Sequence, residues 1–183
     1  MKNGKIIILN GVSSAGKTTL AKTLQRRLNE PFLFLDCDTF IDTAVSNNYF
    51  DYYSVLFRRE MPILHHVTKV LSDKGLNTIL ECTFTDIAFF EESVELLRDY
   101  PVLFVQVNCN RDELRRREIE RGDRDIGFAE KLMSFLEPKE SIYDIIVDTS
   151  NNSNEECVDM IINMLDNPEK FTAFKTLWSK RTK

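Results

Sequence analysis

The sequence predicts an α/β fold in which a five-stranded parallel sheet carries helices on both faces. Five short apolar segments alternate along the chain with segments of helical spacing, as in proteins built from strand–helix–strand units. A glycine-bounded loop joins the first apolar segment to the first helix, and right-handed crossovers place helices on both sides of such a sheet. The strands are expected over residues 5–10, 32–35, 76–80, 102–107 and 143–147, and the helices over residues 19–28, 62–72, 86–98, 111–121, 128–136, 153–166 and 168–180.

The elements are recognised by their spacing and by the residues that end them. Leu20, Leu24 and Leu28 recur at helical spacing, so they should pack the first helix on the sheet, and Pro31 follows its end. The strands read as continuous apolar runs, which is typical of strands that are covered on both faces. Asp86 is placed to cap the helix that precedes the fourth strand.

The loop between the first strand and the first helix, residues 11–18, has the spacing of a phosphate-binding loop, or P-loop. Glycine at Gly11 allows the sharp turn out of the strand, and glycine at Gly16 allows a close approach to phosphate. The Lys17 ammonium group would reach the β- and γ-phosphates of a nucleotide, while the Thr18 hydroxyl would ligate Mg²⁺. The expected cofactors are therefore ATP and Mg²⁺. The expected nucleotide contacts are Gly11, Val12, Ser13, Ser14, Ala15, Gly16, Lys17, Thr18 and Thr19.

Polar residues end the other predicted strands, where ligands bind in parallel sheets. Asp36 and Asp38 follow the second strand, and a carboxylate there could take the proton from an attacking hydroxyl. We favour Asp38 as this base because it is nearer the loop; alternatively, it could hold Mg²⁺ through water or only cap a helix. Glu81 ends the third strand and is expected to help Thr18 hold the metal. Asn108 and Asp148 end the last two strands.

Arginines are concentrated between residues 111 and 124, where they alternate with acidic residues. A solvated helix with ion pairs one turn apart explains most of this pattern. It explains less well why Arg121 and Arg124 flank a turn that contains Gly122. Guanidinium groups on a closing segment can stabilise charge on a transferring phosphoryl group. We therefore expect an Arg-rich lid at about residues 117–128, with Arg121 and Arg124 as catalytic residues beside Lys17 and Asp38.

Composition excludes several classes of protein. The formal net charge of −5 argues against a dedicated nucleic-acid binder. No apolar run is long enough to span a bilayer, and the N-terminus lacks the pattern of a signal peptide, so we expect a cytoplasmic protein with no membrane partner. The four cysteines are widely spaced, as reduced thiols would be. We expect one kinase domain over residues 1–183, with a substrate cap at about 39–60 and a C-terminal amphipathic helix at about 168–180.

Four segments together resemble the chloramphenicol phosphotransferase-like proteins. They are the loop with the strand before it, residues 38–42, residues 120–129 with their Arg-Gly-Asp-Arg run, and the Tyr143-Asp144 pair with Val147-Asp148-Thr149. The resemblance runs in order from residue 6 to about residue 165. It implies an ATP-dependent kinase that acts on a small-molecule hydroxyl, with Asp38 as general base. The sequence departs from the family over residues 39–75, where the acceptor is expected to be chosen.

The leading hypothesis is a phosphotransferase that moves the γ-phosphate of ATP to a hydroxyl of a small organic molecule, similar to chloramphenicol 3-O-phosphotransferase. One alternative is another metabolite kinase, such as a shikimate kinase-like enzyme, which the Asp36-x-Asp38 spacing also resembles. Another is a nucleotide-dependent switch or binding protein without a small substrate. The acceptor, the oligomeric state and the biological role, whether antibiotic resistance, metabolism or toxin-like action on a sugar nucleotide, stay open at this point.

Overall fold

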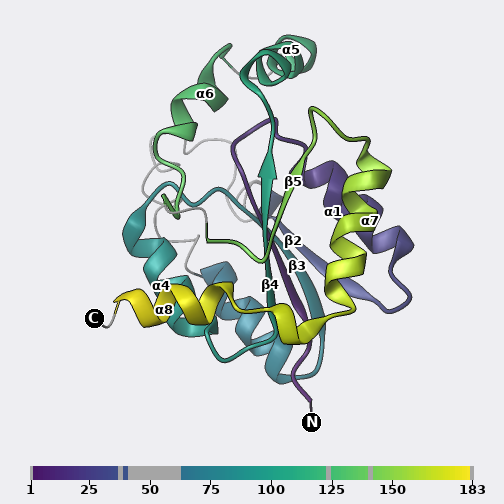
Figure 1. Cartoon of the computed structure of the whole chain (residues 1–183), viewed down its shortest axis with the longest axis vertical. Helices are drawn as coiled ribbons and strands as arrows, with labels where there is room; N and C mark the ends of the chain where they lie inside the picture. The colour runs from purple at the N-terminus through teal and green to yellow at the C-terminus, as the bar shows by residue number, and fades with distance from the viewer. Residues whose placement is uncertain (1, 37–38, 41–62, 123–124, 140–141, 182–183) are drawn as a thin grey trace.

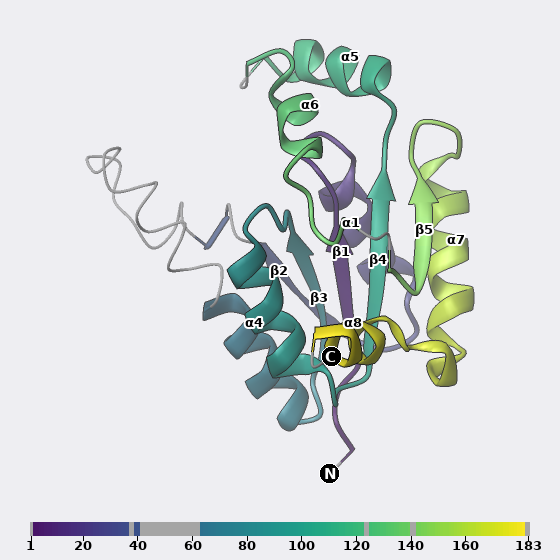
Figure 2. The ribbon, with the colours of Figure 1, turned by 60° about the vertical axis from the view of Figure 1, so that its left-hand side comes forward.

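The chain forms a five-stranded parallel sheet, as its alternating segments predict (Figures 1 and 2). The computed structural model describes residues 2–36, 39–40, 63–122, 125–139 and 142–181. The strand order is β2-β3-β1-β4-β5, so β1 is central and both of its neighbours come from later in the chain. The strands are β1 (Ile6–Asn10), β2 (Phe32–Asp36), β3 (Asn77–Cys82), β4 (Val102–Asn108) and β5 (Ile145–Asp148).

Helices connect the strands and begin at the caps that the sequence indicates. The Asp86 side chain accepts a hydrogen bond from the N–H of Ala88, which confirms it as the cap of α4. Ser153 and Glu156 form a capping box at the start of α7. The helices are α1 (Lys17–Arg27), α4 (Ile87–Leu97), α5 (Arg111–Arg121), α6 (Phe128–Met133), α7 (Asn154–Leu165) and α8 (Ala173–Arg181), with a further helical segment at residues 63–73 and a 3-10 turn at Pro168–Lys170.

Two apolar layers hold the helices on the sheet. Alternate side chains of β1 point to opposite faces, so Ile7 and Leu9 join the layer beneath α1 and α7, while Ile6 and Ile8 join the layer beneath residues 63–73, α4 and α8. All four are fully buried, and each contributes roughly 1.5–3 kcal/mol relative to exposure. This rigid centre fixes the position of the loop that follows β1.

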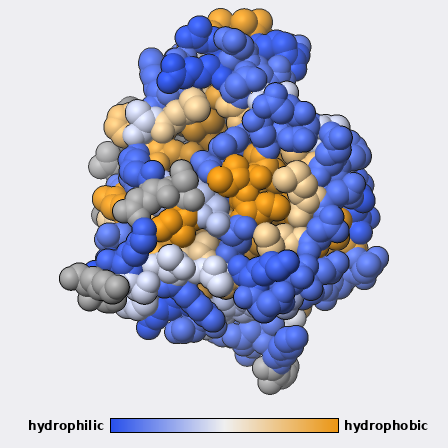
Figure 3. Space-filling model, viewed as in Figure 1, coloured by the Kyte–Doolittle hydropathy of each residue, from blue (hydrophilic) through white to orange (hydrophobic). Residues whose placement is uncertain are grey.

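The carboxyl ends of the strands face α5 and α6, which lie beyond that end of the sheet (Figure 2). The predicted substrate cap falls mostly on residues 41–62 and lies outside the described residues. On the face shown in Figure 3, hydrophilic residues cover most of α7, and hydrophobic residues are exposed in the middle, where β5 forms the edge of the sheet. None of the helices in the described part of the chain has the length and apolarity of a bilayer-spanning segment.

Candidate active site

The P-loop leaves the carboxyl end of β1 and enters α1 with the backbone that its glycines predict. A Cβ atom at Gly11 would lie 2.5 Å from the carbonyl oxygen of Val107, so only glycine fits there. Gly16 has φ 93° and caps α1 without any side-chain hydrogen bond, and the first turn of α1 carries no acidic residue. The first amides of a helix have no partner within the helix itself, and a helix N-terminus of this kind is a typical phosphate-binding site.

Lys17, Thr18 and Glu81 come together at the start of α1, although 63 residues separate the last two. The Thr18 hydroxyl donates to Glu81 Oε2 at 2.8 Å. Lys17 Nζ lies 3.7 Å from Glu81 Oε1 and donates to the Val12 carbonyl at 2.9 Å. Lys17 and Glu81 are 6% and 14% exposed, so their charges interact with little screening by water. A hydroxyl and a carboxylate side by side are the hard oxygen ligands that suit Mg²⁺.

The second strand, β2, ends beside Glu81. Asp36, the last residue of β2, is the register partner of Glu81, so the two strand ends are adjacent. The Asp36 carboxylate accepts hydrogen bonds from the hydroxyl and the N–H of Thr39 at 2.5 and 3.4 Å, and thereby holds the turn that follows. Asp38, the predicted base, lies outside the described residues.

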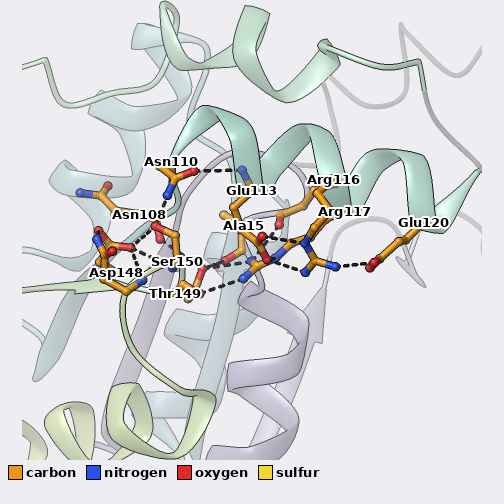
Figure 4. Close-up of polar contacts among 12 residues, drawn as sticks. Ala15, Asn108, Asn110, Glu113, Arg116, Arg117, Glu120, Asp148, Thr149 and Ser150 are labelled. Carbon is orange, nitrogen blue, oxygen red and sulfur yellow. Dashed lines mark hydrogen bonds and ion pairs between the residues drawn. The ribbon is translucent and has the colours of Figure 1, made fainter.

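The predicted Arg-rich lid is not confirmed, and Arg117 is not a free lid residue. Its guanidinium group contacts the P-loop and the residue after β5, as Figure 4 shows. Arg121 is the last residue of α5 and is exposed, and the helix ends at Gly122. Arg124 lies outside the described residues. Arg117 therefore links α5 to the P-loop and to the residue after β5.

Glu118 is a buried structural residue next to the site that sequence analysis missed, because we counted it among the acids of a solvated helix. It is 1% exposed, and its carboxylate accepts hydrogen bonds from the N–H groups of Gly127 and Ala129 at 2.6 and 2.7 Å. It therefore ties α5 to the N-terminus of α6, where a negative charge is favourable. Its spacing of four from Leu114, the other buried residue of α5, was the available signal.

Comparison with known proteins identifies the family. The sequence model of the chloramphenicol phosphotransferase-like proteins matches residues 4–166. The chain belongs to this family.

Individual relatives support the same class of enzyme. A protein of Mycobacterium tuberculosis strain H37Rv, named "Putative O-phosphotransferase", is 27% identical over 152 residues, which are 70% of this chain and 68% of the relative. The shikimate kinase of Enterococcus faecalis is 25% identical over 168 residues, which are 87% of this chain and 97% of that enzyme. The prediction of a kinase is confirmed, and kinases of this kind use a nucleotide such as ATP.

Solved structures confirm the P-loop kinase fold. The APS kinase of Mycobacterium tuberculosis in complex with AMPPNP and APS has a TM-score of 0.68 at 17% identity, covering 91% of this chain and 100% of that one. The shikimate kinase of Acinetobacter baumannii in complex with shikimate has a TM-score of 0.65 at 17% identity, covering 90% and 94%.

The structure gives the Tyr143-Asp144 pair of this chloramphenicol phosphotransferase-like protein a structural role. Both residues precede β5, which begins at Ile145 and not at Tyr143 as predicted. The Asp144 carboxylate accepts hydrogen bonds from the N–H groups of Phe104 and Ala173, and so ties β4 to the start of α8. Tyr143 and Asn10 share a hydrogen bond of 2.9 Å behind the P-loop. Burial raises the pKa of both Tyr143 and Asp144.

Asn108 and Asp148, the polar ends of β4 and β5, are register partners. The Asp148 carboxylate accepts hydrogen bonds from the Ser150 N–H and the Asn151 side chain at 2.8 Å each. Burial works against ionisation of Asp148, but these hydrogen bonds outweigh it and lower the pKa of the carboxyl group. Asp148 therefore shapes the turn after β5.

His65 makes the stability of this protein depend on pH. It is fully buried beside Cys82 and Phe84, and its Nδ1 has no hydrogen-bond partner among the described residues. Burial, with a smaller contribution from the charge of His66, lowers the pKa of His65 from 6.5 to about 4. The unfolded chain therefore binds a proton between pH 6.5 and 4 that the folded protein does not bind. The free energy of unfolding therefore keeps its full value above pH 6.5. It decreases by up to about 3 kcal/mol as the pH falls towards 4.

We expect His65→Phe, which keeps the aromatic contact with Phe84, to flatten this dependence. Between pH 7.5 and 5, the free energy of unfolding of the wild type should fall by about 2 kcal/mol more than that of the variant. Urea denaturation at the two pH values measures the difference, and His66→Phe, at the neighbouring exposed histidine, is the matched control. Equal falls in the wild type and in His65→Phe would show that His65 does not titrate in this window.

Proposed function

We propose that this chain transfers the γ-phosphoryl group of ATP to a hydroxyl of a small organic molecule, in the presence of Mg²⁺. The observation that carries the proposal is the contact of Thr18 with Glu81 beside Lys17, at the N-terminus of α1. A phosphate-binding helix end, a buried ammonium group and a pair of hard oxygen ligands are the parts that phosphoryl transfer requires.

In the proposed reaction, the hydroxyl oxygen of the acceptor attacks the γ-phosphorus of ATP. The bond from that phosphorus to the bridging oxygen breaks, and ADP leaves with the electron pair. Lys17 and the amides of the P-loop hold the phosphates, and Thr18 and Glu81 would hold the metal. Bound Mg²⁺ would neutralise charge on the phosphate oxygens.

Asp38 is the proposed general base that accepts the proton of the acceptor hydroxyl. The pairing of Asp36 with Glu81 supports this assignment, because the chain leaves β2 next to the proposed metal ligands. Arg121 and Arg124 are proposed to stabilise charge on the transferring group. The acceptor is proposed to bind between residues 39–60 and the carboxyl end of the sheet.

The experiment that tests the proposal follows the γ-phosphate of labelled ATP. The protein is incubated with ATP, Mg²⁺ and a panel of alcohols that includes chloramphenicol and shikimate, and the label is traced to the acceptor. Shikimate belongs in the panel because the Enterococcus faecalis shikimate kinase matches over 97% of its length. Slow hydrolysis of ATP without transfer to any alcohol would favour a nucleotide-dependent switch instead.

Once an acceptor is known, Asp38→Asn should lower kcat by about a hundredfold to ten-thousandfold, because it removes the base and keeps the shape of the side chain. Asp36→Asn should have a smaller effect, since Asp36 supports the following turn. The control is Asp159→Asn, which removes an exposed carboxylate on α7. Unimpaired transfer by Asp38→Asn would remove Asp38 from the mechanism.

A further inference from the structure

Two carbonyl oxygens of the P-loop are held by side chains from elsewhere in the chain (Figure 4). Arg117 on α5 donates to the carbonyl of Ser14 at 3.2 Å. The hydroxyl of Thr149, directly after β5, donates to the carbonyl of Ala15 at 2.8 Å. These contacts bridge 103 and 134 residues of sequence, so they join the P-loop to the segments that follow β4 and β5.

The Thr149 hydroxyl is fixed from several sides. The backbone N–H of Thr149 donates to the Asn108 carbonyl at 2.9 Å, which fastens Thr149 to the end of β4. A hydroxyl has one proton to donate and can also accept. The contact with Ala15 is shorter than the 3.2 Å contact with the Asn108 carbonyl, so the hydroxyl proton points towards the Ala15 carbonyl. The hydroxyl oxygen accepts in turn from Arg117 Nη1 at 3.1 Å.

The Arg117 guanidinium group is fixed as well. Its Nε donates to Glu113 Oε1 at 2.8 Å, and its Nη2 donates to the Thr149 carbonyl at 2.8 Å. Hydrogen bonds from Arg116 and Arg117 lower the pKa of Glu113 to about 2, so its carboxylate is charged at neutral pH. The planar group thus reaches Glu113, Ser14 and Thr149 at once, which the single ammonium group of a lysine could not do.

Holding a carbonyl in place also orients the amide of the next residue. In a planar trans peptide, the C=O of one residue and the N–H of the next point in opposite directions. Fixing the Ala15 carbonyl towards Thr149 therefore directs the Gly16 N–H to the other side of the loop. Ser14 has φ 60°, a conformation that a residue other than glycine keeps when its surroundings impose it.

We propose that Thr149 and Arg117 are positioning residues that set the shape of the P-loop for the triphosphate of ATP. The role rests on the proposed function only in that the ligand is a nucleoside triphosphate. It explains why Thr149 follows Val147-Asp148 in the segment that resembles the family. It also assigns Arg117 to the P-loop and not to a lid.

The test compares two ligands that share only the phosphate chain, ATP and inorganic tripolyphosphate, each with Mg²⁺, by titration calorimetry. Thr149→Val removes the hydroxyl and keeps the shape of the side chain, while Thr149→Ser keeps the hydroxyl. Thr149→Val should weaken both ligands by the same factor, about five- to tenfold, which corresponds to one lost hydrogen bond. Thr149→Ser should restore both affinities to within about twofold of the wild type.

Arg117→Lys is the second variant, and it should also weaken both ligands, since lysine keeps the charge but not the fork of donors. The matched control is Arg115→Lys on the outer side of α5, where Arg115 pairs with Glu130. Thermal melting of each variant checks the fold, so that Arg117→Lys decides the question if Thr149→Val does not fold.

Two outcomes would overturn the positioning role. One is a loss of affinity for ATP with none for tripolyphosphate, which would place Thr149 and Arg117 in contact with the nucleoside. The other is no loss for either ligand. A wild type that binds ATP but phosphorylates no hydroxyl would refute the proposed function and leave the positioning role intact.

Discussion

Lys17→Met should lower phosphate transfer by about a thousandfold, a change of about 4 kcal/mol in the activation free energy. Methionine has nearly the length of lysine and no charge, so the variant removes the ammonium group and little else. Lys17 Nζ donates to the Val12 carbonyl and so lies within the P-loop. Charge that develops on the transferring group would then lose its buried counter-charge, and that charge is worth most where water is excluded.

The measurement is kcat with saturating ATP, together with the affinity for ATP by calorimetry. Lys22→Met is the matched control, since Lys22 lies on the exposed face of the same helix. Thermal melting must accompany both, because Lys17 also faces Glu81 at 3.7 Å and its removal changes the charge balance of that pair. A folded Lys17→Met protein with near wild-type kcat would contradict the role of Lys17.

Glu81→Gln should lower transfer by about a hundredfold and raise the Mg²⁺ concentration needed for half-maximal activity. Glutamine retains the shape of the side chain and can still contact the Thr18 hydroxyl, but it lacks the negative charge that attracts a hard cation. Excess Mg²⁺ should therefore restore part of the activity of the variant.

The measurement is the rate of transfer as a function of Mg²⁺ concentration at fixed ATP. Glu155→Gln is the control, because it removes an exposed carboxylate from the first turn of α7, away from the P-loop. If Glu81→Gln shows the wild-type Mg²⁺ dependence with a lower plateau, then Glu81 acts on the reacting groups and does not hold the metal.

Much of the fold could be predicted because its signals are local. Apolar runs a few residues long marked the five strands, and a cap such as Asp86 marked the start of a helix. The P-loop was found in the same way, since its glycines, lysine and threonine are adjacent in the chain. The start of β5 was misplaced, because Tyr143 and Asp144 look like strand residues and instead use their side chains to bind Asn10 and α8.

The site was predictable only in part. Glu81 was expected near Thr18 because both end or follow strands of a parallel sheet, and the structure brings them to 2.8 Å. Glu118 was missed, because its partners are backbone N–H groups and its spacing of four from Leu114, the signal of its burial, was not used. The contact of Arg117 with the P-loop was not predicted, because a charged helix looks the same in sequence whether its arginines face water or a neighbouring loop.

The sequence by itself determined the P-loop, the succession of strands and helices, and the class of chemistry, since each depends on residues that are neighbours in the chain. The tertiary structure alone decided the strand order, and with it that Thr149 and Arg117 reach the P-loop. The physical reason is that these contacts join residues more than a hundred positions apart. Such pairs form only when the whole sheet has assembled, and the cost of closing the chain between them is met by the packing of both apolar layers.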